Sequence, residues 1–133
     1  KEKLSQTTEG VIALSPFKFR IRIYLGGEYF LTADEVEKHG RDLFLIEGKH
    51  TKSENLPSLA DIKDGLLRMI LLTNLEDVEI RKNQFNPIPV LKLTTGSESR
   101  TASLLQQHKK ILDKLKKESR INGFRVLLNT QYL

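Results

Sequence analysis

The sequence contains no cysteine, and its only methionine is Met69. Without cysteine the chain can form neither disulfide bonds nor thiolate metal sites, which fits a reducing, cytoplasmic compartment. No apolar run approaches the ~20 residues that a membrane-spanning helix needs. The longest run, 69–72, suits a buried helix, so we expect no membrane partner.

The sequence also lacks a signal-peptide pattern, internal repeats and low-complexity segments. Because the first residue is Lys1, we expect a piece of a longer polypeptide. Residues 1–10 are polar and show no periodicity, and we interpret 1–15 as a frayed end or the remnant of a longer chain. A length of 133 residues suits one domain and is short for two, so we predict a single domain over 1–133.

The charge of the chain is modestly positive, with a formal net charge of +5 at pH 7. Such a charge favours polyanionic partners, because neutralising phosphates releases counterions. Many basic proteins bind no nucleic acid, so the charge favours this class without establishing it.

Alternating apolar and polar residues predict three antiparallel strands in the first half of the chain. Phe17 to Tyr24 alternates as a half-buried strand, and Gly26-Gly27 supplies a tight turn. Glu28 to Lys38 is the return strand. A second turn at His39-Gly40 then leads into a third strand, Asp42 to Lys49.

Two helices are predicted in the second half. Ser58 has the character of an N-cap, and helical spacing of apolar residues continues to about Asn74. A longer helix carries its apolar face from Leu104 to Leu115 and ends at Asn122-Gly123.

Strands alternate with these helices. Val78 to Arg81 opens a fourth strand, Asn86-Pro87-Ile88-Pro89 interrupts it, and Val90 to Leu93 resumes the β pattern. Phe124 to Leu128 is a final, mostly apolar strand. The order predicts an α/β or α+β fold in which helices flank a central mixed sheet.

The third predicted strand runs into Glu47-Gly48-Lys49. Side chains two residues apart on a strand share a face, so Glu47 and Lys49 point the same way. Asp34 lies on the neighbouring predicted strand, and cross-strand neighbours approach to ~5 Å between Cβ atoms. The two carboxylates and the Gly48 carbonyl are ligands that suit a divalent cation, and Lys49 is a cation that orients a nucleophile or stabilises negative charge. This set suits metal-assisted hydrolysis of a phosphodiester.

The acid-x-lysine tripeptide is by itself weak, because it recurs at Asp61-Ile62-Lys63. There it opens a helix, where residues two apart do not face each other. Asp34, Glu47 and Lys49 also have a structural interpretation, a salt bridge on a solvated sheet face, which contributes ~0–1 kcal/mol.

Thr32-Ala33-Asp34, twelve intervening residues and Glu47-Gly48-Lys49 together resemble the motif of the PD-(D/E)XK nuclease superfamily, which includes the restriction endonucleases. The resemblance covers roughly 16–128 and implies a restriction-endonuclease-like core of order α-β-β-β-α-β. It implies that Asp34 and Glu47 bind Mg²⁺, with Mn²⁺ as a substitute, and that Lys49 is the catalytic lysine. Ala33 stands in place of the usual proline, and no helix is evident before the first strand.

This resemblance implies a Mg²⁺-dependent endonuclease for double-stranded DNA, of type II restriction type or the catalytic domain of such an enzyme. Restriction enzymes pair two catalytic units, so a homodimer or a partner subunit is expected. The alternatives are a repair or recombination nuclease of the same superfamily and a non-catalytic nucleic-acid-binding module. The candidate DNA contacts are polar or basic residues: Lys52, Arg20, Arg22, Asn83 and Gln84. The lysines of 109–117 fit either a DNA contact or the solvated face of a helix.

Overall fold

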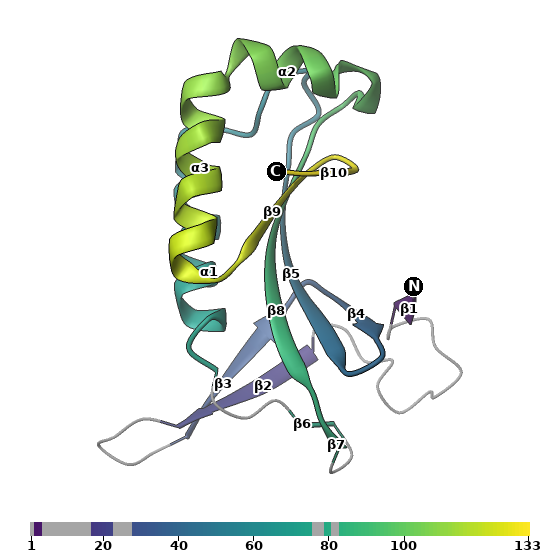
Figure 1. The fold of residues 1–133 in the computed structure, drawn as a ribbon, viewed down its shortest axis with the longest axis vertical. Helices are drawn as coiled ribbons and strands as arrows, with labels where there is room; N and C mark the ends of the chain where they lie inside the picture. The colour runs from purple at the N-terminus through teal and green to yellow at the C-terminus, as the bar shows by residue number, and fades with distance from the viewer. Residues whose placement is uncertain (1, 4–16, 23–27, 76–78, 81–82) are drawn as a thin grey trace.

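The computed structural model describes residues 2–3, 17–22, 28–75, 79–80 and 83–133, and Figure 1 shows their arrangement. A mixed six-stranded sheet forms its centre, with the strand order β1-β4-β5-β8-β9-β10. Its strands are β1 (Glu2–Lys3), β4 (Glu35–His39), β5 (Asp42–His50), β8 (Asn86–Thr94), β9 (Arg125–Leu128) and β10 (Gln131–Tyr132). The expected class, a mixed α and β fold around one central sheet, is confirmed.

Strands β4 and β5 are antiparallel, whereas β5, β8 and β9 are parallel. Parallel neighbours require crossover connections, which helices usually supply. Helix α1 (Leu59–Leu72) lies in the connection from β5 to β8. The connection from β8 to β9 contains η2 (Glu98–Arg100), α2 (Thr101–Gln107) and α3 (Lys109–Asn122).

The predicted return strand, 28–38, is broken at Asp34, so the expected continuous three-stranded meander is wrong. Strand β3 (Glu28–Ala33) pairs with β2 (Phe17–Arg22) in a separate two-stranded sheet, and β4 alone continues antiparallel to β5. At the bend, two hydrogen bonds fix Asp34 against β5.

The two predicted turns have different outcomes. At His39-Gly40 the turn is confirmed: His39 pairs with Asp42 across it, and Gly40 has a φ of 63°. Glycine reaches that region without the steric cost that other residues meet. The predicted turn at Gly26-Gly27 lies outside the described residues.

Helix α1 begins where the sequence predicts and ends two residues earlier than predicted. The Ser58 side chain accepts a hydrogen bond from the backbone N–H of Asp61 at 3.1 Å, which satisfies one of the free donors of the first turn. Gly65, in the middle of the helix, lets α1 approach the sheet closely. A Cβ atom on Gly65 would lie 2.5 Å from Cδ1 of Leu91.

The predicted long helix is two helices, and that prediction is wrong about its continuity. His108 separates α2 from α3 with φ −113° and ψ 30°, outside the helical region. Its backbone N–H still donates to the Leu104 carbonyl, and its carbonyl accepts from Leu112, so the break costs few hydrogen bonds. Helix α3 ends as predicted, at Gly123 with φ 74°.

The two prolines that were expected to interrupt a strand lie inside β8. The Asn86 N–H donates to the Arg41 carbonyl next to β5, so the nitrogens of Pro87 and Pro89 face the opposite side of β8. Pairing of β8 with β9 starts later, at Val90. Proline is tolerated there because no ladder hydrogen bond of the described strands needs its missing N–H.

The three α-helices contribute to a core on one face of the sheet, and Figure 1 shows α1 and α3 on that side. The strands bury Leu43, Leu45, Leu91, Leu93, Val126 and Leu128 there, against Ile62, Met69, Leu72, Leu104, Leu112 and Leu115 of the helices. A smaller cluster of Ile46, Val90 and Leu127 lies on the other face. Along β5, odd-numbered side chains therefore face the helices.

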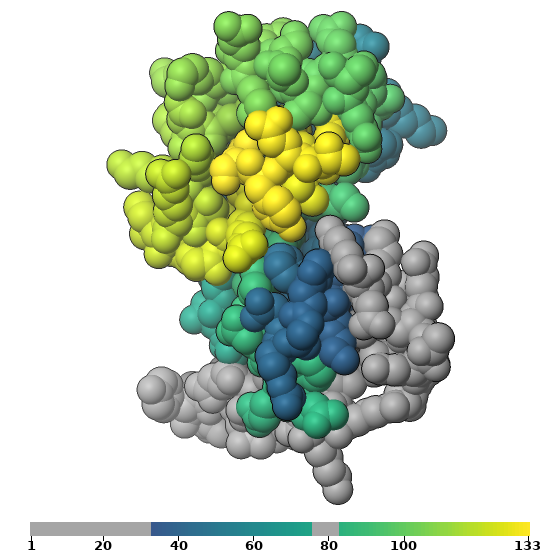
Figure 2. Space-filling model, turned by 45° about the vertical axis from the view of Figure 1, so that its right-hand side comes forward, coloured from purple at the N-terminus to yellow at the C-terminus, as the bar shows by residue number. Residues whose placement is uncertain are grey.

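Figure 2 shows the C-terminal residues lying against α2 and α3. No helix in the described part of the chain is both long and apolar enough to span a membrane.

Candidate active site

Asp34 is held at the bend between β3 and β4 by two hydrogen bonds to β5. Its backbone N–H donates to the Ile46 carbonyl at 3.1 Å, and its Oδ2 accepts the backbone N–H of Gly48 at 3.1 Å. The pairing of Glu35 with Ile46 places Asp34 opposite Glu47 when the register is continued by one residue. The predicted cross-strand relation between these two acids is therefore present in the structure.

Glu47 and Lys49 point toward the helices from the last part of β5. Glu47 is buried, with 8% of its surface exposed, and its Oε2 lies 3.9 Å from Nζ of Lys49. Burial raises the pKa of the Glu47 carboxyl, and the negative charge of Asp34 raises it further. Arg68 and Lys49 act in the opposite direction on this pKa. The Glu47 carboxyl thus experiences the charges of one other acid and of two cations.

Helix α1 adds two residues that the sequence reasoning missed. Oδ2 of Asp64 lies 2.6 Å from Nζ of Lys49, and Nε of Arg68 lies 3.6 Å from Oε1 of Glu47. The hydrogen bond from Lys49 is the main cause of both pKa changes here: it raises the pKa of Lys49 and lowers that of Asp64. The available signal was their spacing, because residues four apart share one side of a helix.

Gly65 explains how α1 reaches this strand end. A Cβ atom there would meet Cδ1 of Leu91 and would lie 3.6 Å from Cγ of Lys49. The aliphatic part of the Lys49 side chain therefore lies directly against Gly65. A larger residue would force either the Leu91 side chain or the helix, with Asp64 and Arg68, to shift.

A cleft of about 330 Å³ opens on the other face of the sheet beside Gly48. It is lined by Asp34, Glu35, Ile46, Gly48, Lys49, His50, Lys92 and Thr94. Nζ of Lys92 lies 3.5 Å from Oε1 of Glu35, and Nδ1 of His50 shares a 2.8 Å hydrogen bond with the Thr94 hydroxyl. His50 lies on this face of β5, opposite to the face that carries the side chain of Lys49. Asp34 and Lys49 line this cleft, whereas Glu47, which faces the helices, does not.

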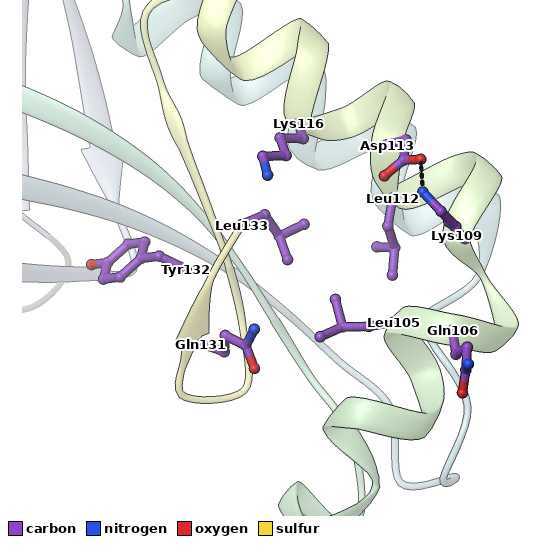
Figure 3. A pocket seen from close by; sticks show the side chains of 9 residues that line it. All are labelled: Leu105, Gln106, Lys109, Leu112, Asp113, Lys116, Gln131, Tyr132 and Leu133. Atoms are coloured by element: carbon purple, nitrogen blue, oxygen red, sulfur yellow. Dashed lines mark hydrogen bonds and ion pairs between the residues drawn. The ribbon is translucent and has the colours of Figure 1, made fainter.

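A second cleft, of about 390 Å³, lies between α2, α3 and β10 (Figure 3). Its floor is partly apolar, with Leu105, Leu112 and Leu133. The only carboxylate among its lining residues, Asp113, is paired with Lys109 at 2.7 Å. It lacks the paired acids that mark the strand end, so we place the candidate site at the motif.

The predicted DNA contacts are scattered over the molecule. Lys52 is exposed in the segment just after β5, close to the motif. Asn83 and Gln84 form β7, a two-residue strand paired with β6 (Glu79–Ile80). They lie near the start of β5, because Nη1 of Arg41 donates to the Gln84 carbonyl at 3.3 Å.

The distance along β5 separates these groups from the motif. Lys49 lies seven residue steps along the strand from its start at Asp42, which corresponds to roughly 23 Å at 3.3 Å per residue. Asn83 and Gln84 therefore cannot share a phosphate with Lys49. Arg20 and Arg22 lie in β2, and their side chains are outside the part that the structure describes.

The candidate donors for a divalent cation at the strand end are two carboxylates and one backbone carbonyl. Among the described residues no group of three or more His, Cys, Asp or Glu could hold a metal ion, so a cation here would have only the carboxylates of Asp34 and Glu47 as side-chain ligands. Burial is the main cause of the raised pKa of Glu47, and the charge of Asp34 adds to it; a cation bound at this carboxyl would lower the pKa again. Oxygen ligands of this kind suit Mg²⁺, which retains water in its remaining positions.

Comparison of the chain with protein-family models, with curated proteins and with solved structures gives no significant match.

Proposed function

We propose that this protein is a Mg²⁺-dependent DNA endonuclease of the PD-(D/E)XK superfamily, with a restriction-endonuclease-like core. The order of elements from β2 to β9 supports this proposal. Strands precede α1, the short β6 and β7 and then β8 follow it, and α2 and α3 precede β9. The parallel crossover from β5 through α1 to β8 places the motif strand in the middle of the sheet.

One observation carries the proposal: Asp34 meets the Glu47-Gly48-Lys49 strand at its open end. The Asp34 carboxylate is fixed on the Gly48 N–H at 3.1 Å, while Glu47 is buried beside it with Lys49 3.9 Å away. Residues 14 positions apart in sequence thus converge at one point. A solvated surface salt bridge, the alternative interpretation, would not require a buried acid.

The residues have separable roles in phosphodiester hydrolysis. Asp34, Glu47 and the Gly48 carbonyl would hold the cation. When bound, Mg²⁺ lowers the pKa of a coordinated water and neutralises charge on the phosphate oxygens. Lys49, whose Nζ is anchored by Asp64, orients the water and stabilises the negative charge that develops on the phosphate.

The partner is double-stranded DNA. The net charge of +5 supports a polyanionic substrate, and Lys52 follows the motif closely enough to contact the same strand. Because one such centre cuts one strand, cutting of both strands requires a homodimer or a partner subunit. We place this activity in the cytoplasm.

Incubation with plasmid DNA, with and without Mg²⁺, tests the proposal. Wild-type protein should cut only with Mg²⁺, and Lys49→Ala should abolish cutting. The matched control is Lys63→Ala, because Lys63 belongs to the other acid-x-lysine tripeptide and is exposed on α1. Retained cutting by Lys49→Ala would overturn the proposal, as would an absence of metal-dependent cutting by wild type.

The products separate the restriction role from its alternatives. Sequencing of the ends should give one short duplex sequence for a restriction enzyme. Preferential cutting of forked or four-way junctions over linear duplexes would instead assign a repair or recombination role. Binding of DNA without metal uptake through Asp34 and Glu47 would assign a non-catalytic binding module.

A further inference from the structure

The two carboxylate oxygens of Glu47 face two different cations. Oε2 is 3.9 Å from Nζ of Lys49, and Oε1 is 3.6 Å from Nε of Arg68. Lys49 has a closer partner, because its Nζ lies only 2.6 Å from Asp64. Arg68 is therefore the nearer of the two counterions of Glu47.

Arg68 reaches the site from the solvent side. Its side chain is 27% exposed, whereas that of Glu47 is 10% exposed. The helix that carries it is brought close by Gly65, as described above. A guanidinium presents a planar fork of donors that matches two oxygens of a phosphate, and its position at the rim lets it turn outward.

The charge of the site changes sign when a divalent cation binds. The described groups are the carboxylates of Asp34, Glu47 and Asp64 and the cations of Lys49 and Arg68, which gives a net charge of −1. A divalent ion on Asp34 and Glu47 raises this to +1. Arg68 would then face a cation in place of a free carboxylate, and the site as a whole would attract a phosphate.

We propose that Arg68 is a phosphate-contacting residue, held on Glu47 until that carboxylate binds a divalent cation. The inference rests on the proposed function, since it takes Glu47 as a metal ligand. In the metal-free protein Arg68 neutralises the buried acid. In the loaded protein it leaves Glu47 and donates to the DNA backbone near the scissile bond.

Metal affinity gives a test that does not depend on activity. The full chain is titrated with Mn²⁺ in a calorimeter as wild type, Arg68→Gln, Arg68→Lys and Arg100→Gln. Arg100 is the matched control, because it also pairs with a carboxylate, Glu54 at 3.2 Å, but outside the site.

Arg68→Gln should bind Mn²⁺ about tenfold more tightly, because a cation that competes with the metal for Glu47 is gone. Arg68→Lys, which keeps the charge, should stay within about twofold of wild type, and Arg100→Gln should match wild type. A purely structural role for Arg68 would loosen the site, so weaker or unchanged Mn²⁺ binding by Arg68→Gln overturns the inference.

DNA binding gives the second readout. The affinity of the Ca²⁺-loaded proteins for a 30-base-pair duplex (about three helical turns) is measured over a range of salt concentrations. Loss of one phosphate contact in Arg68→Gln should reduce the slope of log affinity against log salt by about 0.9, with no change in Arg100→Gln. An unchanged slope for Arg68→Gln overturns the inference.

The two proposals fail in distinguishable ways. If wild-type protein takes up no Mn²⁺ through Asp34 and Glu47, the proposed function is overturned and this inference with it. If wild type binds Mn²⁺ and cuts DNA while Arg68→Gln matches it in both measurements, only the inference about Arg68 is overturned.

Discussion

The carboxylate of Asp34 accepts the backbone N–H of Gly48 at 3.1 Å, across the gap between the bend after β3 and the end of β5. This contact fixes a side chain and a strand end to each other. It lies next to the Glu35–Ile46 pair, which is the last residue pair between β4 and β5 at this end of the two strands.

Replacement of Asp34 separates the charge of this residue from its hydrogen bond. Asp34→Asn keeps an oxygen acceptor for the Gly48 N–H, so its unfolding midpoint in urea should stay close to that of wild type. Asp34→Ala loses the acceptor and should be less stable by about 1 kcal/mol. Both variants should lose Mg²⁺-dependent cleavage, since both lack the carboxylate. Cleavage by Asp34→Asn at the wild-type rate would contradict the assigned role.

Glu47→Gln should be at least as stable as wild type at pH 7 without metal. An acid whose pKa is higher in the folded protein binds more protons when folded, so stability falls as pH rises from its ordinary value of 4.5 to the raised one. The glutamine side chain does not titrate, so the stability of Glu47→Gln does not fall in this way as the pH rises. Thermal unfolding from pH 4 to pH 8 measures the difference.

Added Mg²⁺ should make wild type more stable than Glu47→Gln. The cation binds the folded wild type and raises its melting temperature by mass action, but leaves Glu47→Gln unchanged. A stabilisation of both proteins by Mg²⁺ would place the metal elsewhere. Asp113→Asn is the control, because Asp113 lies in the other cleft, in an exposed pair with Lys109.

Gly65→Ala should destabilise the protein although alanine is the better helix former. Alanine contributes up to about 1 kcal/mol of helix propensity. Its Cβ would lie 2.5 Å from Cδ1 of Leu91, which is fully buried, and such overpacking costs about 1–3 kcal/mol. We expect a net loss near 1 kcal/mol in urea unfolding.

The companion change Leu91→Ala tests the cause of that loss. In the double variant Gly65→Ala/Leu91→Ala the added methyl has room, so the combined destabilisation should be smaller than the sum of the single effects. Strict additivity would show that the glycine is needed for some reason other than the contact with Leu91.

Asp64→Asn should lower cleavage by about tenfold without changing the unfolding midpoint in urea. Asp64 is exposed on α1, so its pair with Lys49 contributes little to folding, but it fixes the position of Nζ at 2.6 Å. The effect should fall on kcat and leave KM unchanged. Asp61→Asn, one turn earlier on the same helix, is the control and should cut at the wild-type rate.

Local signals in the sequence predicted much of this fold. The Ser58 cap and the apolar spacing located α1, the Gly123 end of α3 was correct, and the pairing of Glu47 and Lys49 on one strand face was read from alternation. These features depend on neighbouring residues, and each has a characteristic residue pattern.

The features that were missed depend on contacts distant in sequence. The break at Asp34 follows from its hydrogen bonds to β5, while the pattern of 28–38 alternates without interruption. Asp64 and Arg68 belong to the site because α1 packs against β5. No local sequence pattern predicts this packing. Residues 86–89 were predicted to interrupt the strand because they contain two prolines. The Pro87 nitrogen, however, faces the side of β8 on which pairing with β9 has not yet begun.

The same two prolines affect how the molecule meets other copies of itself. An exposed strand margin with free amide protons is a template for a foreign strand, and hence for aggregation. Pro87 and Pro89 remove two such protons from one margin of β8, next to the point where β9 joins. That stretch cannot recruit a further strand through a full ladder, so its sequence protects the protein from self-association at this margin.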